Sequence, residues 1–395
     1  MVNIERRVVI TGIGMICSLG ENIEEVLDSL VKNKIGIGKT KLLEKYKELK
    51  YIMTGDCNLP IYDIADVDST EKIEIMVRKA IDEVMLNAKL TIDDLKKKGE
   101  RVALSFSSSL VGNTQMIKAL EDKNRSEIWC LYSRQFVSKL MKKYNIKGSV
   151  YTTTSACAAG TAGIALGYDL IKSNEADIVL VGGADYLCEF TIFGFNSLKS
   201  LSKGICKPFD DNRDGLNIGE ASVFFIFEEI NHAKNRGVEK YYGEILGYGL
   251  ANEAYHMTSP NPSGEGATFA MEMAIKEAGI NPEDIDYINA HGTGTRANDI
   301  MELNAIRSLF NENTYVSSIK SRTGHCLGAA GSVELACSLL AINSNYIPTT
   351  LNSKLDIEGG EKYLYRKNSN KKVKYFLSNS FAFAGNIASV LIKTN

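Results

Sequence analysis

One cysteine of the chain stands in surroundings where a thiol could react. Cys157 lies in "TTTSACAAGTAG", among alanines, glycines and hydroxyl residues, where an expected strand gives way to an expected helix. A thiol at a helix N-terminus faces free N–H groups and the positive end of the helix dipole, which lower its pKa and favour the thiolate. Taken alone, the stretch favours the alternative, an inert cysteine buried in a tightly packed helix, which describes most cysteines of cytosolic proteins.

Two histidines stand in places that match the place of Cys157. His291 in "NAHGTGTRAND" and His325 in "SSIKSRTGHCLGAAG" each follow an expected strand and precede a glycine-rich turn. α/β sheets place ligands at the C-terminal ends of their strands, so these three side chains are expected in one site with Cys157 as a nucleophile. The other histidines, His232 and His256, lack such surroundings and are expected on a surface helix and in a loop.

Short apolar runs that alternate with amphipathic stretches must position these side chains. Strands are expected at 6–14, 101–109, 148–155, 176–185, 219–229, 241–251, 285–293, 314–321, 373–381 and 387–394. Helices are expected at 22–33, 72–88, 158–174, 268–279, 299–310 and 328–343, with Asn22 and Gly279 as caps. The alternation predicts an α/β layered fold with largely parallel sheets.

The order of strands and helices repeats, with a split near residue 240. In each half, a helix rich in small residues begins just after a strand and a reactive-looking residue, Cys157 or His325. We therefore expect two related halves, 1–240 with the cysteine and 241–395 with both histidines. No low-complexity linker separates them, which indicates a large interface between the halves.

Composition narrows the class of protein. The chain has 395 residues, is 44% hydrophobic and carries a net charge of −2, which argues against non-specific nucleic-acid binding. Its eight cysteines form no C-x-x-C pair, so neither a disulfide framework nor a metal site of the usual spacing is expected. The apolar N-terminal stretch contains charges and has the pattern of a strand, so no signal peptide or membrane span is expected. Reduced thiols fit a cytoplasmic protein.

Two short motifs offer other functions. "TGIGMICSLG" supplies Gly12 and Gly14 of a G-x-G-x-x-G dinucleotide fingerprint, but Cys17 occupies the third glycine position. A tight strand-to-helix turn is the preferred interpretation of these glycines. "SSIK" at 317–320 fits the S-x-x-K pattern of serine acylases, but its companions S-D-N and K-T-G are absent, which favours a chance match.

Five motifs together give the chain a family resemblance. "TTTSACAAG", "KPFDDNRDGLNIGEA", "NAHGTGTRAND", "SSIKSRTGHCLGAAGSVE" and "SNSFAFAG" occur in the order found in the β-ketoacyl-acyl carrier protein synthases. Over nearly its whole length, the chain resembles the elongating type II (KAS II-like) condensing enzymes. The resemblance implies a thiolase-like fold, a duplicated five-layered αβαβα architecture. It also implies a decarboxylating Claisen condensation in fatty-acid or polyketide/polyene biosynthesis.

The resemblance also implies roles for individual residues. Cys157 would carry the acyl chain as a thioester, while His291 and His325 would hydrogen-bond the malonyl thioester carbonyl as neutral imidazoles. Backbone N–H groups of Cys157 and Phe383 would form the oxyanion hole, and the Phe383 ring would gate the malonyl site. Lys320 is placed with the catalytic residues. Its pair with the partner acid Glu334 either orders the histidine loop and tunes its electrostatics or is a purely structural buried ion pair. Thr293 and Thr295 match the threonines that bind the pantetheine arm.

Partners follow from the same resemblance. Acyl carrier protein would deliver substrates on its phosphopantetheine, no cofactor would be bound, and the chain would form a dimer with an identical or related subunit. Neither nucleic acid nor a membrane is expected as a partner. Two alternatives stay open. One is a chain-length-shaping partner subunit, although such subunits lack the cysteine found here at 157. The other is a thiolase, which would need a second catalytic cysteine in place of His325, and the neighbouring Cys326 is a poor substitute.

Some segments depart from the family pattern. The loop "NSFAFAGNI" has Ala382 and Ala384 where the family has glycines, and is expected to be stiffer or differently shaped. The stretch 111–147, which shapes the acyl tunnel and dimer interface in the family, is shorter than usual. Lys207 matches a basic carrier-facing position, whereas the charges at 69–79 are mixed. The acyl chain and the pathway are therefore left open.

Overall fold

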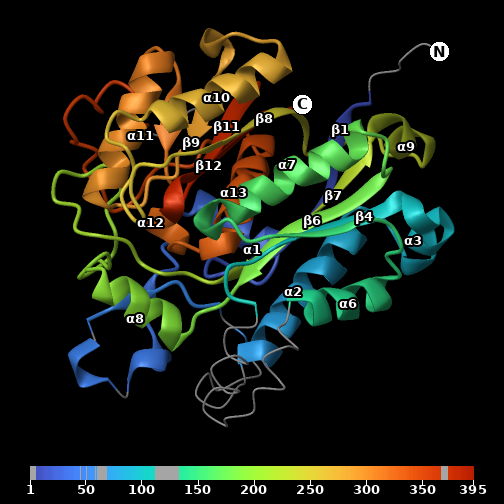
Figure 1. Ribbon diagram of the computed structural model, residues 1–395, viewed down its shortest axis with the longest axis horizontal. Helices are drawn as coiled ribbons and strands as arrows, with labels where there is room; N and C mark the ends of the chain where they lie inside the picture. Colours follow the sequence, from blue (N-terminus) through green and yellow to red (C-terminus); the bar gives the residue numbers. More distant parts are fainter. Residues whose placement is uncertain are drawn as a thin grey trace.

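A large mixed sheet forms the centre of the molecule (Figure 1). The computed structural model describes residues 6–44, 46–49, 51–57, 59, 69–111, 133–365 and 372–395. Residues 112–132, most of the stretch expected to be short, lie outside this part, as do the side chains at 69–71. The strands are β1 (Val8–Cys17), β4 (Val102–Ser107), β5 (Val150–Thr153), β6 (Ile178–Asp185), β7 (Ala221–Glu229), β8 (Gly243–Asn252), β9 (Tyr287–Asn289), β10 (Tyr315–Ser317), β11 (Tyr375–Phe381) and β12 (Asn386–Lys393). A second, two-stranded sheet pairs β2 (Gly38–Lys39) with β3 (Met53–Thr54).

The large sheet consists of two five-stranded halves with one topology. The strand order is β5-β4-β6-β7-β1 in the first half and β10-β9-β11-β12-β8 in the second. In both halves the first two neighbouring pairs are parallel and the last two are antiparallel. The prediction of largely parallel sheets is therefore wrong. A short turn rather than a crossover joins β11 to β12, and such a connection reverses the strand direction.

Helices form three layers around these half-sheets. Helices α7 (Ala159–Lys172) and α13 (Ala330–Asn343) lie between them, since α7 contacts β6 and β12 while α13 contacts β7 and β11. On the outer faces, α2 (Ser69–Asn87) covers β1 and β7, and α10 (Glu265–Ala278) covers β8 and β12, with α11 (Arg296–Leu309) packed against α10. The predicted αβαβα layering is confirmed. The remaining helices are α1 (Ile23–Val31), α3 (Ile92–Lys98), α6 (Ser133–Tyr144), α8 (Glu189–Ser197), α9 (Ile230–Asn235) and α12 (Lys320–Thr323).

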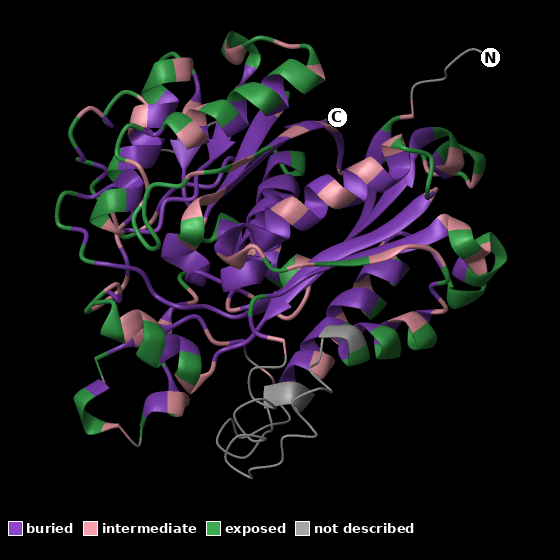
Figure 2. Cartoon of the chain, viewed as in Figure 1, coloured by how far each residue is buried: buried purple, intermediate pink, exposed green. Residues whose placement is uncertain are grey.

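Burial follows the layers. The strands and the central helices are largely buried, whereas the outer helices expose one face (Figure 2). Helix α13 is buried on all sides from Ala330 to Ile342, as expected for a core helix. Both predicted caps are confirmed: the Asn22 side chain accepts the Glu25 N–H, and Gly279 ends α10 in the left-handed region at φ 66°. Over the described ranges, no helix is long and apolar enough to cross a membrane.

Gly12 and Gly14 lie inside β1 and not in a strand-to-helix turn, so that prediction is wrong. A Cβ on Gly14 would lie 2.1 Å from the carbonyl oxygen of Ala80, and one on Gly12 would lie 2.7 Å from the Cβ of Ala88. These glycines let the backbone of α2 approach the strand closely. Their role is packing, and a phosphate-binding turn is not formed here.

Candidate active site

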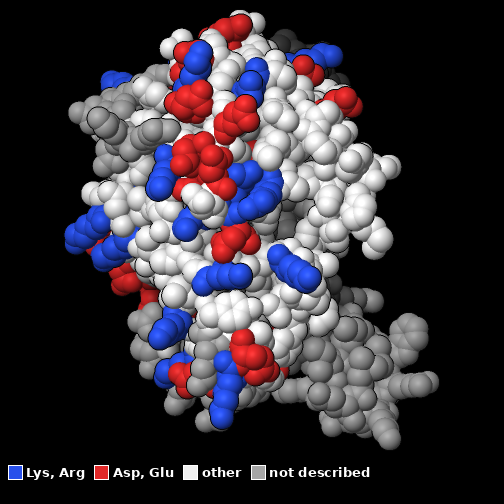
Figure 3. All heavy atoms as spheres, turned by 90° about the vertical axis from the view of Figure 1, so that its left-hand side faces the viewer, with Lys and Arg blue, Asp and Glu red and all other residues white. Residues whose placement is uncertain are grey.

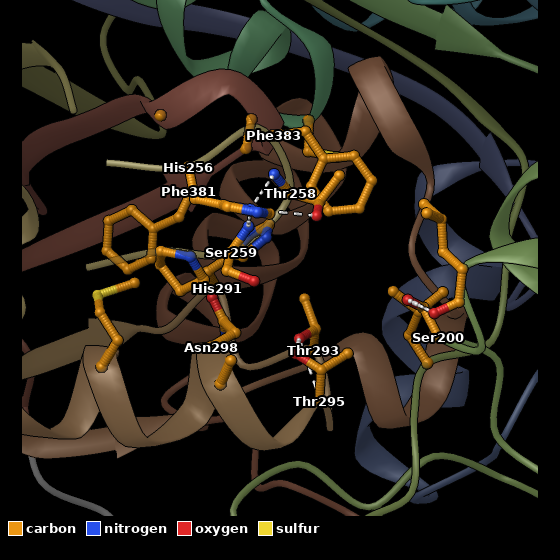
Figure 4. Close-up of a pocket in the computed structure, with 18 of the residues that line it drawn as sticks. Ser200, His256, Thr258, Ser259, His291, Thr293, Thr295, Asn298, Phe381 and Phe383 are labelled. Atoms are coloured by element: carbon orange, nitrogen blue, oxygen red, sulfur yellow. Dashed lines mark hydrogen bonds between the residues drawn. The ribbon is translucent and has the colours of Figure 1, made fainter. Parts of the chain in front are cut away.

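A pocket with a volume of about 250 Å³ brings the predicted side chains of both halves together. Figure 4 shows His291, Thr293, Thr295 and Phe383 in its lining. One wall carries Thr293 and Thr295, whose hydroxyl oxygens lie 2.9 Å apart. The pocket lining includes six of the predicted residues: Cys157, His291, Thr293, Thr295, His325 and Phe383. Lys320 and Glu334 are buried behind this lining.

Cys157 sits in a tight turn that leads into α7. The turn spans Ala156–Ala158, and Ala156 has φ 48°, a left-handed conformation that is strained for a residue with a Cβ. The thiol is 8% exposed. Burial raises the pKa of the Cys157 thiol to about 12, although the charge of Lys320 opposes this. The predicted lowering of this pKa is therefore wrong, because desolvation outweighs the charges and N–H groups at the helix start.

The two histidine rings meet edge to face. Their centroids lie 5.3 Å apart with an angle of 86° between the planes, and both residues are buried. Burial lowers the pKa of His291 and of His325 well below the ordinary value, and the positive charge of Lys320 lowers both further. Both imidazoles are neutral near pH 7, which confirms this part of the prediction.

Lys320 fixes the tautomer of His291. Its Nζ donates to the His291 carbonyl oxygen at 2.6 Å and lies 3.1 Å from His291 Nδ1. An ammonium group only donates, so Nδ1 accepts and the neutral ring carries its proton on Nε2. The same Nζ forms a buried ion pair with Glu334, and burial raises the pKa of that carboxyl group to about 7. This network orders the His291 loop.

Backbone hydrogen bonds hold both histidine loops from the other side. The Glu302 carboxylate accepts the N–H groups of His291 at 2.8 Å and Gly292 at 2.7 Å. The N–H of His325 donates to the Asn217 carbonyl at 2.7 Å, and its carbonyl accepts the Gly219 N–H at 3.0 Å. Sequence reasoning missed Glu302. The available signal was an acidic residue on the inner side of the helix that follows the His291 loop.

The loop between β11 and β12 closes one side of the pocket. The rings of Phe383 and Phe195 stack, with centroids 5.7 Å apart. Of the two unusual alanines, Ala382 is extended at φ −133°, whereas Ala384 is left-handed at φ 59°. The Ala384 N–H donates to the Met257 carbonyl at 2.8 Å. Only one of the two alanines therefore introduces backbone strain.

His256 lies in an exposed loop, as predicted, and this loop also lines the pocket, which was not predicted. Its Nδ1 accepts the N–H groups of Thr258 at 3.1 Å and Ser259 at 3.2 Å, which shapes the loop after β8 (Figure 4). The signal for this placement was that the loop follows a strand end at the same sheet edge. Lys207 is half-buried, and Cys326 is buried outside the pocket lining.

The fold and the pocket identify a thiolase-like enzyme class, two homologous halves with the cysteine of one facing histidines of the other. Residues 5–233 match the family model of the β-ketoacyl synthase N-terminal domain, and residues 242–354 match that of the C-terminal domain. The chain therefore belongs to the β-ketoacyl synthase family.

Relatives of the chain agree with this assignment. It is 33% identical to a putative mitochondrial 3-oxoacyl-[acyl-carrier-protein] synthase of Schizosaccharomyces pombe, over 98% of this chain and 99% of the relative. It is 32% identical to 3-oxoacyl-[acyl-carrier-protein] synthase 2 of Coxiella burnetii, over 98% of each chain. A solved type II PKS acyl-carrier protein in complex with its ketosynthase bound to the hexaketide gives a TM-score of 0.90 at 27% identity, covering 99% of this chain and 100% of that one.

Proposed function

We propose that the chain is an elongating 3-oxoacyl-acyl carrier protein synthase. It joins an acyl group held on Cys157 to the two-carbon unit of a malonyl group. The observation that carries this function is the pocket that unites the Cys157 turn with two neutral imidazoles, one with its proton fixed on Nε2. A thiol supplies covalent catalysis, and neutral imidazoles supply hydrogen-bond donors for an enolate oxygen.

Acyl transfer to Cys157 is the first step. The sulfur attacks the thioester carbon of the acyl carrier, and the bond to the pantetheine sulfur breaks. Because burial raises the pKa of the thiol to about 12, the proton stays on the sulfur until the attack and passes to the leaving pantetheine sulfur as the new thioester forms. The N–H groups of Cys157 and Phe383 stabilise the oxyanion.

Decarboxylation and condensation follow on the histidines. His291 and His325 donate hydrogen bonds to the carbonyl oxygen of the malonyl thioester. As CO2 leaves, its bonding electrons move into the enolate, whose α-carbon attacks the Cys157 thioester. A carbon–carbon bond forms, and the sulfur of Cys157 leaves and is protonated. Lys320 acts as a positioning residue, because it orients His291 and compensates the charge of Glu334.

Substrates arrive on the phosphopantetheine of acyl carrier protein, with Thr293 and Thr295 along the arm and Phe383 at the malonyl side. On the face shown in Figure 3, basic and acidic side chains are interspersed, so a field of one sign does not guide the carrier there. We also propose that the chain forms a dimer with an identical or related subunit. The chain itself is proposed to consist of two halves divided near residue 240. The repeated strand order supports the division. Seven free cysteines in the described part support a cytoplasmic location.

The test is the Cys157→Ala variant with acyl- and malonyl-carrier proteins. Intact mass should show acylation of the wild-type chain and none of the variant, while the variant still releases CO2 from malonyl-carrier protein. His325→Ala should show the reverse loss. Condensation by Cys157→Ala at the wild-type rate contradicts the function. A wild-type chain that is never acylated alone, but changes product length with a sister synthase, supports the partner-subunit alternative.

A further inference from the structure

Besides Glu302 and Glu334, another buried carboxylate lies close to the turn that carries Cys157, and no step of the proposed reaction uses it. Asp185 ends β6, is fully buried, and has no ion-pair partner among the described Lys, Arg and His side chains. Its oxygens accept hydrogen bonds from four groups. These are Ser108 Oγ at 2.6 Å, Ser109 N at 3.0 Å, Leu110 N at 3.0 Å and Gly328 N at 2.6 Å.

These donors come from both halves of the chain. Residues 108–110 follow β4 in the first half, and Gly328 lies in the turn before α13 in the second half. The link extends to the nucleophile, because Ser109 Oγ donates to the carbonyl oxygen of Ala156 at 3.2 Å. On the opposite side, a Cβ on Gly160 would lie 2.9 Å from the Gly328 oxygen, so the start of α7 rests on the same turn.

Both turns contain a strained residue that needs such support. Ala156 precedes Cys157 with φ 48°, and Leu327 precedes Gly328 with φ 53°. Left-handed residues with a Cβ persist only where surrounding contacts enforce them. Asp185 bonds directly to one turn and reaches the other through Ser109.

We infer that Asp185 is a positioning residue for acyl transfer. Its carboxylate clamps the 108–110 loop to the Gly328 turn and thereby fixes the backbone on both sides of Cys157. The expected effect on acyl transfer rests on the proposed function, whereas the structural role of the clamp does not. The histidines are held separately, by Glu302, Lys320 and the backbone of the segment 217–219, so the clamp supports acyl transfer to the thiol and not the decarboxylation.

Two substitutions should break the clamp from opposite sides. Asp185→Asn keeps the shape but turns one acceptor into an NH2 donor, which then faces an N–H of Gly328 or of the 108–110 loop. Gly328→Ala places a methyl group 2.8 Å from Asp185 Oδ2 and 2.8 Å from Ser109 N. Ser109→Ala is the mildest variant, because it removes only the bond to Ala156. Asp177→Asn is the matched control: this aspartate flanks the other end of β6, where it pairs with Arg6 and Arg101.

The variants are compared in the full chain by three measurements. Acyl transfer from acyl-carrier protein should fall at least about tenfold in kcat for Asp185→Asn and Gly328→Ala with KM unchanged, since displacement of a reacting group costs rate. Malonyl decarboxylation should stay within about twofold of wild type, by the same argument. Alkylation of Cys157 by iodoacetamide, followed by peptide mass mapping, should not slow in either variant, because a small reagent needs no fixed geometry. In Asp185→Asn, the Asp185 charge that raises the pKa of this thiol is also gone. Asp177→Asn should match wild type in all three.

Hydrogen exchange keeps the clamp testable apart from the proposed function. The amides of Ser109, Leu110 and Gly328 should exchange faster in Asp185→Asn than in wild type. Unchanged exchange and unchanged acyl transfer overturn the inference, as does an equal loss of acyl transfer and decarboxylation, which marks a general structural role. If wild type itself transfers no acyl group, the proposed function fails, and exchange still decides on the clamp. If Asp185→Asn does not fold, Ser109→Ala must show the kcat loss, or the inference is wrong.

Discussion

The turn at Cys157 and the turn at Gly328 occupy matching places in the two halves, yet only one carries a reactive group. Each follows the edge strand of its half-sheet, β5 or β10, and leads into a 14-residue central helix, α7 or α13. Each begins with a left-handed residue, Ala156 or Leu327. The letters "ACAAGT" and "LGAAGS" align across them. The backbone is repeated, and the side chains differ.

The surroundings of the two turns differ in a complementary way. Cys157 faces the second half, where His291, His325 and Phe381 line the pocket. Gly328 faces the first half, where Asp185 accepts its N–H and also accepts hydrogen bonds from the loop after β4. The turn of the first half places the Cys157 thiol in the pocket, whereas the backbone of the matching turn is held by the Asp185 carboxylate. Of the two matching turns, one therefore carries the reactive group and the other contributes to holding the backbone around it.

The largest effect should come from making the two turns alike. Cys157→Gly should lower acyl transfer by at least about a thousandfold, the scale seen when a covalent nucleophile is removed. The free energy of unfolding should change by less than about 2 kcal/mol, because the thiol is small and lines a cavity. Intact mass after incubation with acyl-carrier protein and thermal unfolding check both statements. An acylated variant would show that another side chain is the acceptor.

The next largest effect concerns the stability that depends on the buried ion pair between Lys320 and Glu334. Lys320→Met leaves the Glu334 carboxyl group buried without its cation and should cost about 3–5 kcal/mol of stability, whereas Lys320→Met with Glu334→Leu should recover most of it. Urea unfolding of the two variants measures the difference. Equal stability of the two would mean that the pair contributes no coupling.

The same variants test the protonation state of the histidines. In wild type the pKa of each histidine lies well below its ordinary value, so both rings stay neutral as the pH falls, and decarboxylation should be flat from about pH 8 to about pH 6. Without the Lys320 charge these pKa values rise, and the rate should decline on the acid side. An acid limb already present in wild type would contradict the neutral assignment.

A smaller effect is expected where the two central helices touch. A Cβ on Gly331 would lie 2.2 Å from Thr161 Oγ1, and one on Gly160 would lie 3.0 Å from Ser332 N. Alanine at either glycine should cost about 1–3 kcal/mol by overpacking. Gly194→Ala in α8, where a Cβ meets nothing within 4 Å, is the matched control and should be neutral or slightly stabilising. Thermal unfolding of the three variants would reveal whether the helices can separate.

The smallest effect concerns the loop that follows β11, the counterpart of β6. Ala384→Gly should relieve left-handed strain and raise the free energy of unfolding by up to about 1 kcal/mol. Ala382→Gly, at an extended position, should lower it slightly. Stability and the rate of Cys157 acylation are measured together. A stability gain from Ala382→Gly would show that the strain lies elsewhere in the loop.

Much of this architecture could be predicted because the signals are local. Alternating apolar runs fixed the order of strands and helices, Asn22 and Gly279 marked helix ends, and small residues beside Cys157 marked the turn. Other features depend on distant partners. Gly12 resembled a turn glycine because nothing near it in the sequence shows that α2 presses on the strand. Asp185 gave no signal, since its four donors lie far away along the chain.

The electrostatics of the thiol were the least predictable part. The position of Cys157 at a helix start predicted a lowered thiol pKa, because N–H groups and the helix dipole favour the thiolate. Burial by residues from both halves raises the pKa of Cys157 to about 12, and no local pattern reports how much water the fold removes. The place of the His256 loop beside the pocket was missed for a related reason, because this loop reaches the pocket only through the tertiary fold.

The buried, protonated state of Cys157 has a consequence for the lifetime of the enzyme. Thiolates attack peroxides and disulfides, so a resting sulfur that keeps its proton reacts slowly with both. The chain should therefore withstand mild oxidative stress without a repair system dedicated to this residue. Because the proton leaves this sulfur mainly during acyl transfer, the thiolate fraction that a peroxide could oxidise stays small between turnovers, and irreversible sulfinic acid formation is slow.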